Sequence, residues 1–236
     1  MKIWAIGDLH LGFSTGKWMD KFGEHWKEHH LKVEASWRER IVPGDIVLLP
    51  GDFSWAMKAD EARQDFAWLA QLPGRKVLIK GNHDYWWPPS HARMRDLLPD
   101  GTYALKRKAL ILDGVPFIGV RGGDFPSDDD PERAKTQANL ESEMKELELS
   151  IQHLATLGEH RHPMIALCHY PPFPPGKAES VVTRRIEEAG ARFCVYGHLH
   201  TQADWEKSFQ GDLRGVNYRL VACDFLDFKP LFLLEV

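Results

Sequence analysis

Five short clusters of polar residues carry the side chains of this chain that could do metal chemistry. Each cluster comes at the end of a short apolar run. In order, they are Gly7-Asp8-Leu9-His10, Gly51-Asp52, Gly81-Asn82-His83-Asp84, His169 and Gly197-His198-Leu199-His200. Imidazole, carboxylate and amide oxygen together suit borderline or hard divalent ions such as Mn²⁺, Zn²⁺ or Fe²⁺. The residue types therefore predict a metal site.

The spacing within the clusters supports this prediction. Residues two apart project to the same side of an extended chain, so Asp8 can act with His10, and His198 with His200. In four of the five clusters a glycine precedes a proposed ligand, which suits a sharp exit from a strand. A shared carboxylate can bridge two ions about 3.5 to 4 Å apart. Asp52 is our candidate for that bridge.

The clusters need a scaffold that brings them together, and the apolar runs before them predict one. Short β-rich runs alternate with longer helical patterns. The strands are expected at 3–6, 46–49, 77–79, 165–168 and 193–196, and the helices at about 20–40, 58–71, 88–98, 131–157 and 179–189. This alternation predicts an α/β fold with parallel strands buried on both faces. The carboxyl ends of such strands face one crevice, so the clusters should converge there.

Two further regions predict a second, partly antiparallel sheet. The pattern of residues 109–119 is typical of a hairpin that turns at Asp113-Gly114. The pattern of residues 218–236 is typical of two strands that are joined around Asp227. The helix at 131–157 carries one apolar stripe, which we expect to pack on a sheet; a short homodimer seam is the alternative. Without a repeat or linker, we expect a single domain over residues 1–236.

Composition limits the partners and the compartment. A net charge of −4 and a pI near 6.3 give no electrostatic footprint for nucleic acid. No apolar run approaches the roughly 18 to 20 residues of a membrane helix, and the N-terminus lacks the features of a signal peptide. The odd set of Cys168, Cys194 and Cys223 predicts buried free thiols in a reducing compartment. We therefore expect a cytoplasmic protein with no membrane partner.

The five clusters together resemble the calcineurin-like metallophosphoesterase superfamily. Its scattered pattern D-x-H, G-D, G-N-H-D/E, H and G-H-x-H occurs here in order between Asp8 and His200. The resemblance implies a four-layer α/β/β/α sandwich with two mixed β-sheets. It also implies two divalent metal ions, for which Mn²⁺ is our first choice and Fe²⁺, Zn²⁺ or Ni²⁺ are alternatives. One ion would take Asp8, His10, Asp52 and His200, and the other Asp52, Asn82, His169 and His198.

The same resemblance implies the catalytic roles. His83 would face the substrate, and Asp84 would orient it through a carboxylate–imidazole pair. The nucleophile would be a metal-bridging hydroxide that attacks phosphorus in line. Asn82 would also touch the substrate. Arg121 follows an apolar strand and is either a phosphate clamp or one half of a loop ion pair.

The predicted function is hydrolysis of a small-molecule phosphate monoester or diester. A nuclease should have a basic groove or a DNA-binding domain, and a catalytically silent scaffold should have lost ligands. Protein phosphatases of this superfamily usually carry G-D-x-V-D-R-G, whereas this chain continues Gly51-Asp52-Phe53-Ser54-Trp55. Lipid-precursor pyrophosphatases usually have arginine where this chain has His83.

Two groups of residues near the clusters have less specific interpretations. Aromatic residues such as Trp55, Tyr85 and Phe173 either pack the core and its rim or form a wall for a nucleoside or other flat leaving group. The histidines of the segment EHWKEHH, including His29, are expected on a polar helix face.

Overall fold

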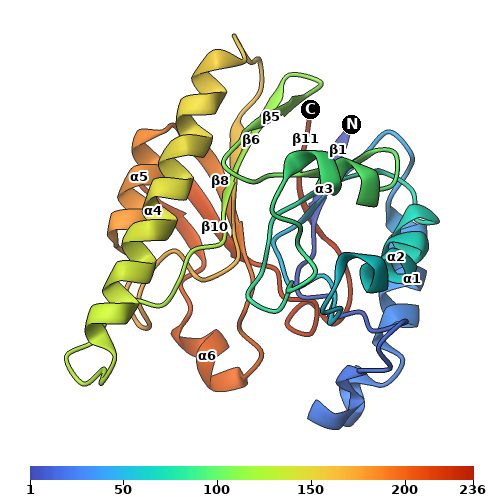
Figure 1. Ribbon diagram of the computed structural model, residues 1–236. Helices are drawn as coiled ribbons and strands as arrows, with labels where there is room; N and C mark the ends of the chain where they lie inside the picture. The colour runs from blue at the N-terminus through green and yellow to red at the C-terminus, as the bar shows by residue number, and fades with distance from the viewer. The chain divides into compact units, whose positions relative to one another are not determined.

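The chain forms two compact units, which the computed structural model describes over residues 1–236. Unit 1 comprises Met1–Ala104 and Val221–Val236, and unit 2 comprises Leu105–Leu220. Each unit has its own β-sheet and helices (Figure 1). The α/β class with two mixed sheets is thus confirmed, and the single domain stays a prediction.

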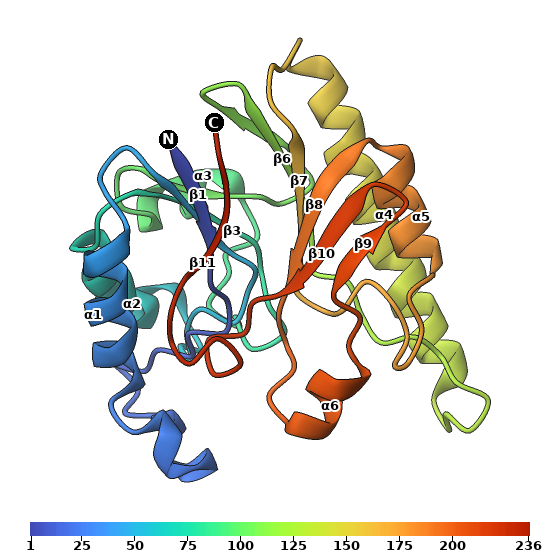
Figure 2. The same cartoon turned by 180° about the vertical axis from the view of Figure 1, so that it is seen from behind.

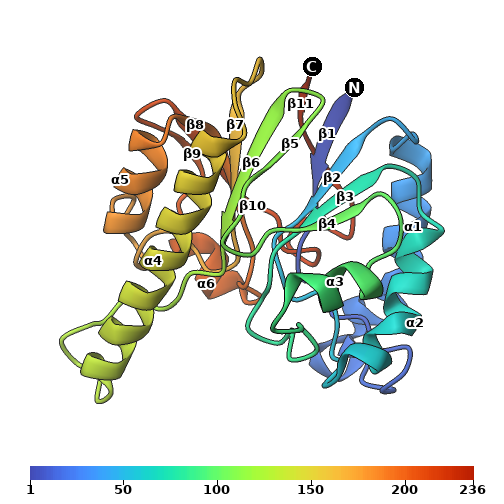
Figure 3. The same ribbon diagram turned by 45° about the horizontal axis from the view of Figure 1, so that its top comes forward.

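Unit 1 is built on a five-stranded sheet in the order β11-β1-β2-β3-β4 (Figure 3). The strands are β1 (Lys2–Ala5), β2 (Ile46–Leu49), β3 (Arg75–Leu78), β4 (Thr102–Ala104) and β11 (Leu231–Glu235). The first four pair in parallel, and β11 adds to β1 in the antiparallel sense. The helices are α1 (His29–Arg40), α2 (Ala59–Ala70) and α3 (His91–Leu97).

The core of unit 1 explains why these segments fold as they do. Trp37 of α1 and Phe66 of α2 are almost fully buried in one apolar cluster with Leu49 of β2. Each such side chain contributes about 1.5 to 3 kcal/mol by leaving water. At the start of α2, the Glu61 carboxylate accepts hydrogen bonds from the amides of Met57 and Lys58, at 2.8 and 3.2 Å. These bonds fix the end of the helix that faces the loop after β2.

Unit 2 is built on a six-stranded sheet in the order β5-β6-β7-β8-β10-β9. The strands are β5 (Leu110–Leu112), β6 (Val115–Val120), β7 (Met164–Cys168), β8 (Ala191–Tyr196), β9 (Gly211–Leu213) and β10 (Val216–Leu220). Strands β6, β7, β8 and β10 are parallel, and both edge strands are antiparallel to their neighbours. A short helix, α6 (Gln202–Lys207), follows β8.

Two longer helices, α4 (Arg133–Thr156) and α5 (Val181–Glu188), lie on the same face of this sheet (Figure 2). The predicted stripe of α4 supplies the buried residues Leu140, Leu147 and Leu154. The helix packs on β6, as its sequence pattern predicts. The alternative of a homodimer seam is not needed to explain the stripe.

The predicted hairpin is confirmed. Leu112 of β5 pairs with Val115 of β6, and the two residues between them, Asp113 and Gly114, have φ of 50° and 84°. Positive φ at both turn positions marks a type I′ turn, whose twist matches that of the strands. The Asp-Gly dipeptide therefore predicts this turn correctly.

Two sequence expectations are wrong. The strands at 218–236 do not form a hairpin: β10 belongs to the sheet of unit 2, and β11 to the sheet of unit 1. The chain leaves β10 and pairs with the loop after β1, where Gly7 N donates to Val221 O at 2.6 Å and Cys223 N to Gly7 O at 3.0 Å. The helix expected at 20–40 is interrupted by non-helical backbone at Gly23 and Glu28, with φ of 145° and 52°. Two 3₁₀ turns, η1 (Met19–Phe22) and η2 (Glu24–Trp26), precede α1 instead.

The remaining composition-based expectations concern cysteines and membranes. All three cysteines are free thiols and are buried, as predicted. None of the helices is long and apolar enough to cross a membrane.

Candidate metal-binding residues

Unit 1 brings three of the predicted ligands together at the carboxyl ends of neighbouring strands. Asp8 and His10 follow β1, and Asp52 follows β2. His10 Nε2 lies 3.7 Å from Asp52 Oδ2. The nearest ligand atoms of Asp8 lie within 4.8 Å of those of His10 and of Asp52. All three side chains are buried.

The backbone of these loops has an unusual conformation. Asp8, His10 and Asp52 have φ of 56°, 44° and 49°, and His198 in unit 2 has φ of 75°. Positive φ is uncommon for residues other than glycine, and such backbone is often found where side chains must be aimed at a functional centre. Two bonds hold the loops of unit 1 in this form, from Asp8 N to Gly51 O at 3.0 Å and from His10 N to Asp52 O at 2.9 Å.

Gly81, in the loop after β3, has to be a glycine because Asp52 lies directly against it. A Cβ at Gly81 would fall 2.0 Å from Asp52 Oδ1 and 2.2 Å from Asp52 N. The same oxygen accepts a hydrogen bond from His83 N at 2.8 Å. The loop that carries Asn82 is therefore attached directly to the proposed bridging carboxylate.

Asp84 does not make the expected pair with the imidazole of His83. Its Oδ1 accepts hydrogen bonds from Phe53 N, Ser54 N and Trp86 Nε1 at 3.0, 3.2 and 2.8 Å, and its Oδ2 accepts one from Gly81 N at 2.8 Å. The side chain is fully buried. Burial and then the charge of Asp52 raise the pKa of Asp84, and the donated bonds oppose that rise. The carboxylate thus braces the loops after β2 and β3, a role that adjacency in sequence does not indicate.

The aromatic residues beside these loops have divided roles. The Trp55 ring stacks on His10, with centroids 4.8 Å apart, and lies 4.5 Å from the His83 ring. Trp86 is buried in the core, whereas Tyr85 is 55% exposed beside His83. Core packing is therefore confirmed for Trp86, and the substrate wall stays a prediction, for which Tyr85 is exposed.

His29 is a residue whose role sequence reasoning missed. The polar-face expectation is wrong for it, because its side chain is only 1% exposed. Its Nε2 lies 2.8 Å from Leu9 O, between Asp8 and His10, and its Nδ1 lies 3.2 Å from Trp26 O. A ring protonated on Nε2 donates to the Leu9 carbonyl and positions the first ligand loop. The spacing of His29, Val33 and Trp37 was the available signal, because steps of four place all three on one face of α1.

Unit 2 places its histidines at the ends of β7 and β8. His169 follows β7 directly, and its carbonyl accepts a hydrogen bond from Gly197 N at 3.0 Å. The rings of His169 and His198 are 5.1 Å apart at 78° to each other. His169 is buried, whereas His198 and His200 are half-buried. Unit 2 therefore brings His169 and His198 together, with His200 two residues further along the same loop.

Arg121 lies at the end of β6, and its Nη2 is 2.6 Å from Glu143 Oε1 of α4. The sequence left two roles open for Arg121, an ion pair and a phosphate clamp, and this contact is the ion pair. Burial raises the pKa of Glu143, and the guanidinium opposes that effect. A second role for Arg121 as a phosphate clamp stays a prediction.

Comparisons with known proteins concern the family and the fold of the chain. The family model described as calcineurin-like phosphoesterase matches residues 1–202. The Gene 66 protein of Mycobacterium phage D29 is 31% identical over 150 residues, which cover 60% of this chain and 73% of that protein. The Gene 66 protein of Mycobacterium phage L5 is 30% identical over 81 residues, or 34% of this chain and 39% of that protein.

A crystal structure of a phosphopantetheinyl hydrolase from Mycobacterium tuberculosis has a similar fold. It aligns with a TM-score of 0.57 over 100% of this chain and 96% of that one, at 17% sequence identity. At this identity the likeness concerns the fold alone.

Proposed function

The chain belongs to the calcineurin-like phosphoesterase family, and from this premise we propose that it hydrolyses a small-molecule phosphate monoester or diester with two divalent metal ions. Family membership makes the protein a phosphoesterase and hence a hydrolase. The number of metal ions, their identity and the substrate class belong to the proposal.

The observation that carries the proposal is the left-handed backbone at Asp8, His10, Asp52 and His198. Such backbone costs on the order of 1 to 3 kcal/mol per residue in unfavourable cases. A chain keeps several costly conformations when they aim side chains that are needed together. Four of the ten non-glycine residues with positive φ are among the seven ligands that the family pattern indicates, and three of those four are buried.

The chemistry of the donors fits the proposed ions. Carboxylates, imidazoles and one amide favour Mn²⁺, with Fe²⁺, Zn²⁺ or Ni²⁺ as alternatives. Following the family pattern, we assign Asp8, His10, Asp52 and His200 to one ion and Asp52, Asn82, His169 and His198 to the other. The surroundings of Asp52 suit a bridging role, because its two oxygens face different partners, His83 N and the His10 ring.

In this proposal, the bound ions lower the pKa of water and neutralise phosphoryl charge. His83 faces the substrate and donates a proton to the leaving oxygen. Trp55 and the bond from His83 N to Asp52 hold that histidine in place. Asn82 also contacts the phosphoryl group. Asp84 holds the loops after β2 and β3 together by accepting hydrogen bonds from both.

Two other functions remain as alternatives. A catalytically silent scaffold has no need of seven intact ligand positions, and all seven are present. A nuclease is disfavoured by the net charge of −4. No structural observation favours either alternative over a small-molecule substrate.

The proposal is tested with purified protein supplied with Mn²⁺ and assayed on p-nitrophenyl phosphate and its diester. We expect a chelator to lower hydrolysis by at least about 100-fold and Mn²⁺ to restore it, because the metal supplies the nucleophile. Activity that resists the chelator contradicts the metal-dependent mechanism. Phosphopantetheine esters are added to the screen, because the structural neighbour is named for hydrolysing them.

A further inference from the structure

Unit 2 contains a pocket of about 270 Å³ with His198 in its wall. The pocket is formed by the loops after β6, β7 and β8 together with α6, all within unit 2. Its volume lies just below the roughly 300 to 1,000 Å³ typical of small-molecule sites. This size suits one compact organic group and not a polymer.

The apolar part of the pocket is aromatic. The ring of Tyr170 lies over that of His198, with centroids 4.0 Å apart and an angle of 33°. Phe173 is only 2% exposed, and its ring is fixed edge-on against Tyr196 at 5.3 Å. Phe125 adds a third, half-buried ring. Flat aromatic surfaces favour a flat ligand through stacking and edge-to-face contacts.

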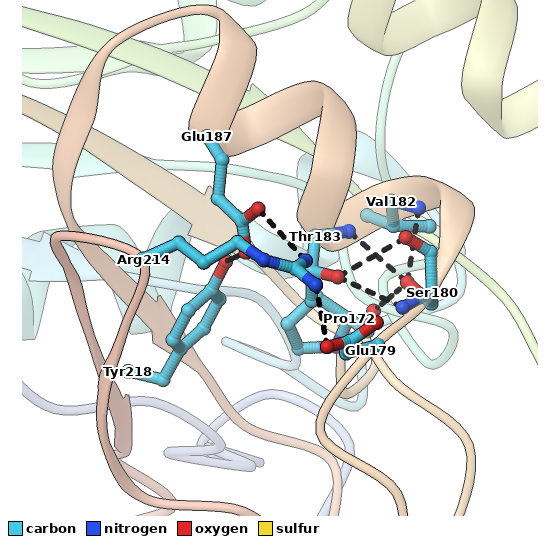
Figure 4. Close-up of polar contacts among 8 residues, drawn as sticks. All are labelled: Pro172, Glu179, Ser180, Val182, Thr183, Glu187, Arg214 and Tyr218. Carbon is cyan, nitrogen blue, oxygen red and sulfur yellow. Dashed lines mark hydrogen bonds and ion pairs between the residues drawn. The ribbon is translucent and has the colours of Figure 1, made fainter.

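The loop that carries Tyr170 and Phe173 is hydrogen-bonded to Ser180 at the start of α5. Ser180 Oγ donates to Pro172 O at 2.5 Å and accepts from Val182 N and Thr183 N, both at 3.0 Å (Figure 4). The same serine therefore caps α5 and ties the pocket wall to that helix. A wall that is fixed before binding reduces the entropy lost when a ligand is ordered.

The polar part of the pocket is formed by Asp124, Asp204 and Lys207. Two carboxylates and one ammonium give this part a formal charge of −1, which disfavours an additional phosphate on the ligand. Asp204 already accepts a hydrogen bond from Thr201 Oγ1 at 2.5 Å. The exposed Asp124 carboxylate is the acceptor best able to receive bonds from ligand hydroxyls.

We propose that this pocket receives the leaving group of the substrate and that this group is a nucleoside. The inference rests on the proposed function, in which His198 binds metal beside the scissile phosphate. The base lies against Tyr170 and Phe125, and the ribose hydroxyls donate to Asp124. Water then adds to phosphorus, the bond from phosphorus to the ribose oxygen breaks, and that oxygen takes a proton. The products are a nucleoside and inorganic phosphate.

The test compares adenosine monophosphate with p-nitrophenyl phosphate, which lacks ribose hydroxyls, on the Mn²⁺-loaded protein. We expect Asp124→Asn to raise KM for the nucleotide about 5- to 20-fold more than KM for the aryl phosphate, because a neutral amide oxygen replaces the charged acceptor of the ribose hydroxyls. Phe125→Ala should raise the same KM. Asp129→Asn is the matched control, because Asp129 is exposed, belongs to the same acidic segment and does not line the pocket.

A second measurement does not depend on turnover. Saturation-transfer NMR with free adenosine and Zn²⁺-loaded protein should detect binding to the wild type and to Asp129→Asn, and much weaker binding to Asp124→Asn. Absence of binding to the wild type, or equal effects of the two aspartate variants, overturns the nucleoside proposal. If aryl phosphate is not hydrolysed but adenosine binding still depends on Asp124, the proposed function fails and the pocket assignment stands.

Discussion

The candidate ligands of the two units differ in their surroundings. In unit 1, the buried residues Asp8, His10 and Asp52 lie in loops that are hydrogen-bonded to one another. In unit 2, His169 is buried, but His198 is half-buried and forms part of a pocket wall. Under the proposed function, unit 1 holds three ligands in hydrogen-bonded loops, whereas unit 2 supplies histidine ligands and also contacts the group attached to the phosphate.

Each unit also has its own side chain that holds its loops in place, Asp84 in unit 1 and Ser180 in unit 2. Asp84 uses both carboxylate oxygens to hold the two ligand loops of unit 1 against each other. Ser180 holds a pocket loop of unit 2 against the start of α5. Each of these side chains can be removed by one substitution. We predict that the loss of stability and of protection from hydrogen exchange stays within the unit that carries the substitution.

The largest effect is expected for Asp84→Ala. Four buried donors lose their acceptor, so unfolding free energy should fall by about 3 to 5 kcal/mol. Hydrogen exchange followed by mass spectrometry should show lost protection at residues 51–55 and 79–87, with β6, β7 and β8 still protected. Asp129→Ala serves as the exposed control. Equal loss of protection in both units would contradict the division between them.

A smaller effect is expected for Ser180→Ala, which removes a helix cap and the bond to Pro172 O together. The cost of a lost cap is about 0.5 to 2 kcal/mol. Denaturant unfolding should show this loss, and hydrogen exchange should rise at residues 171–183. Thr201→Ala removes the cap of α6 and should leave exchange in that loop unchanged. Increased exchange in the ligand loops of unit 1 is the result that would count against a local role.

The last effect is a pH dependence and concerns a buried lysine of unit 1. Burial lowers the pKa of Lys76 from 10.5 to about 8, although its Nζ donates to Leu72 O at 2.5 Å. The unfolded chain therefore binds the proton more tightly, and stability should rise as pH increases from about 8 to 10.5. Lys76→Met should be more stable than the wild type at neutral pH and should lose this slope. An unchanged slope in unfolding experiments between those pH values would show that another group is responsible.

Sequence predicted best the features that depend on neighbouring residues along the chain. Strand β2 is predicted to the residue, and the turn at Asp113-Gly114 follows from the need for positive φ. The ligand clusters were found because their residue types follow apolar runs. Each unit then places its own clusters at the ends of parallel strands, as that pattern requires.

The features that sequence did not predict depend on contacts between distant segments. Asp84 was expected to pair with its neighbour in sequence, but its acceptor capacity is used by amides on two loops. His29 was expected on a polar face, but it reaches the carbonyl of Leu9. The strands around Asp227 enter different sheets, because the segment after β10 pairs with Gly7. Each error comes from a tertiary partner that local spacing does not specify.

The central claim is that Asp52 binds metal whereas His83 acts on the substrate. The most direct test measures metal content by plasma mass spectrometry and turnover of an aryl phosphate, for the wild type, Asp52→Asn and His83→Ala. We predict two ions per chain in the wild type and in His83→Ala, turnover at least about 100-fold lower in His83→Ala, and loss of metal in Asp52→Asn alone. Equal metal loss in both variants, or full turnover in His83→Ala, would contradict the account.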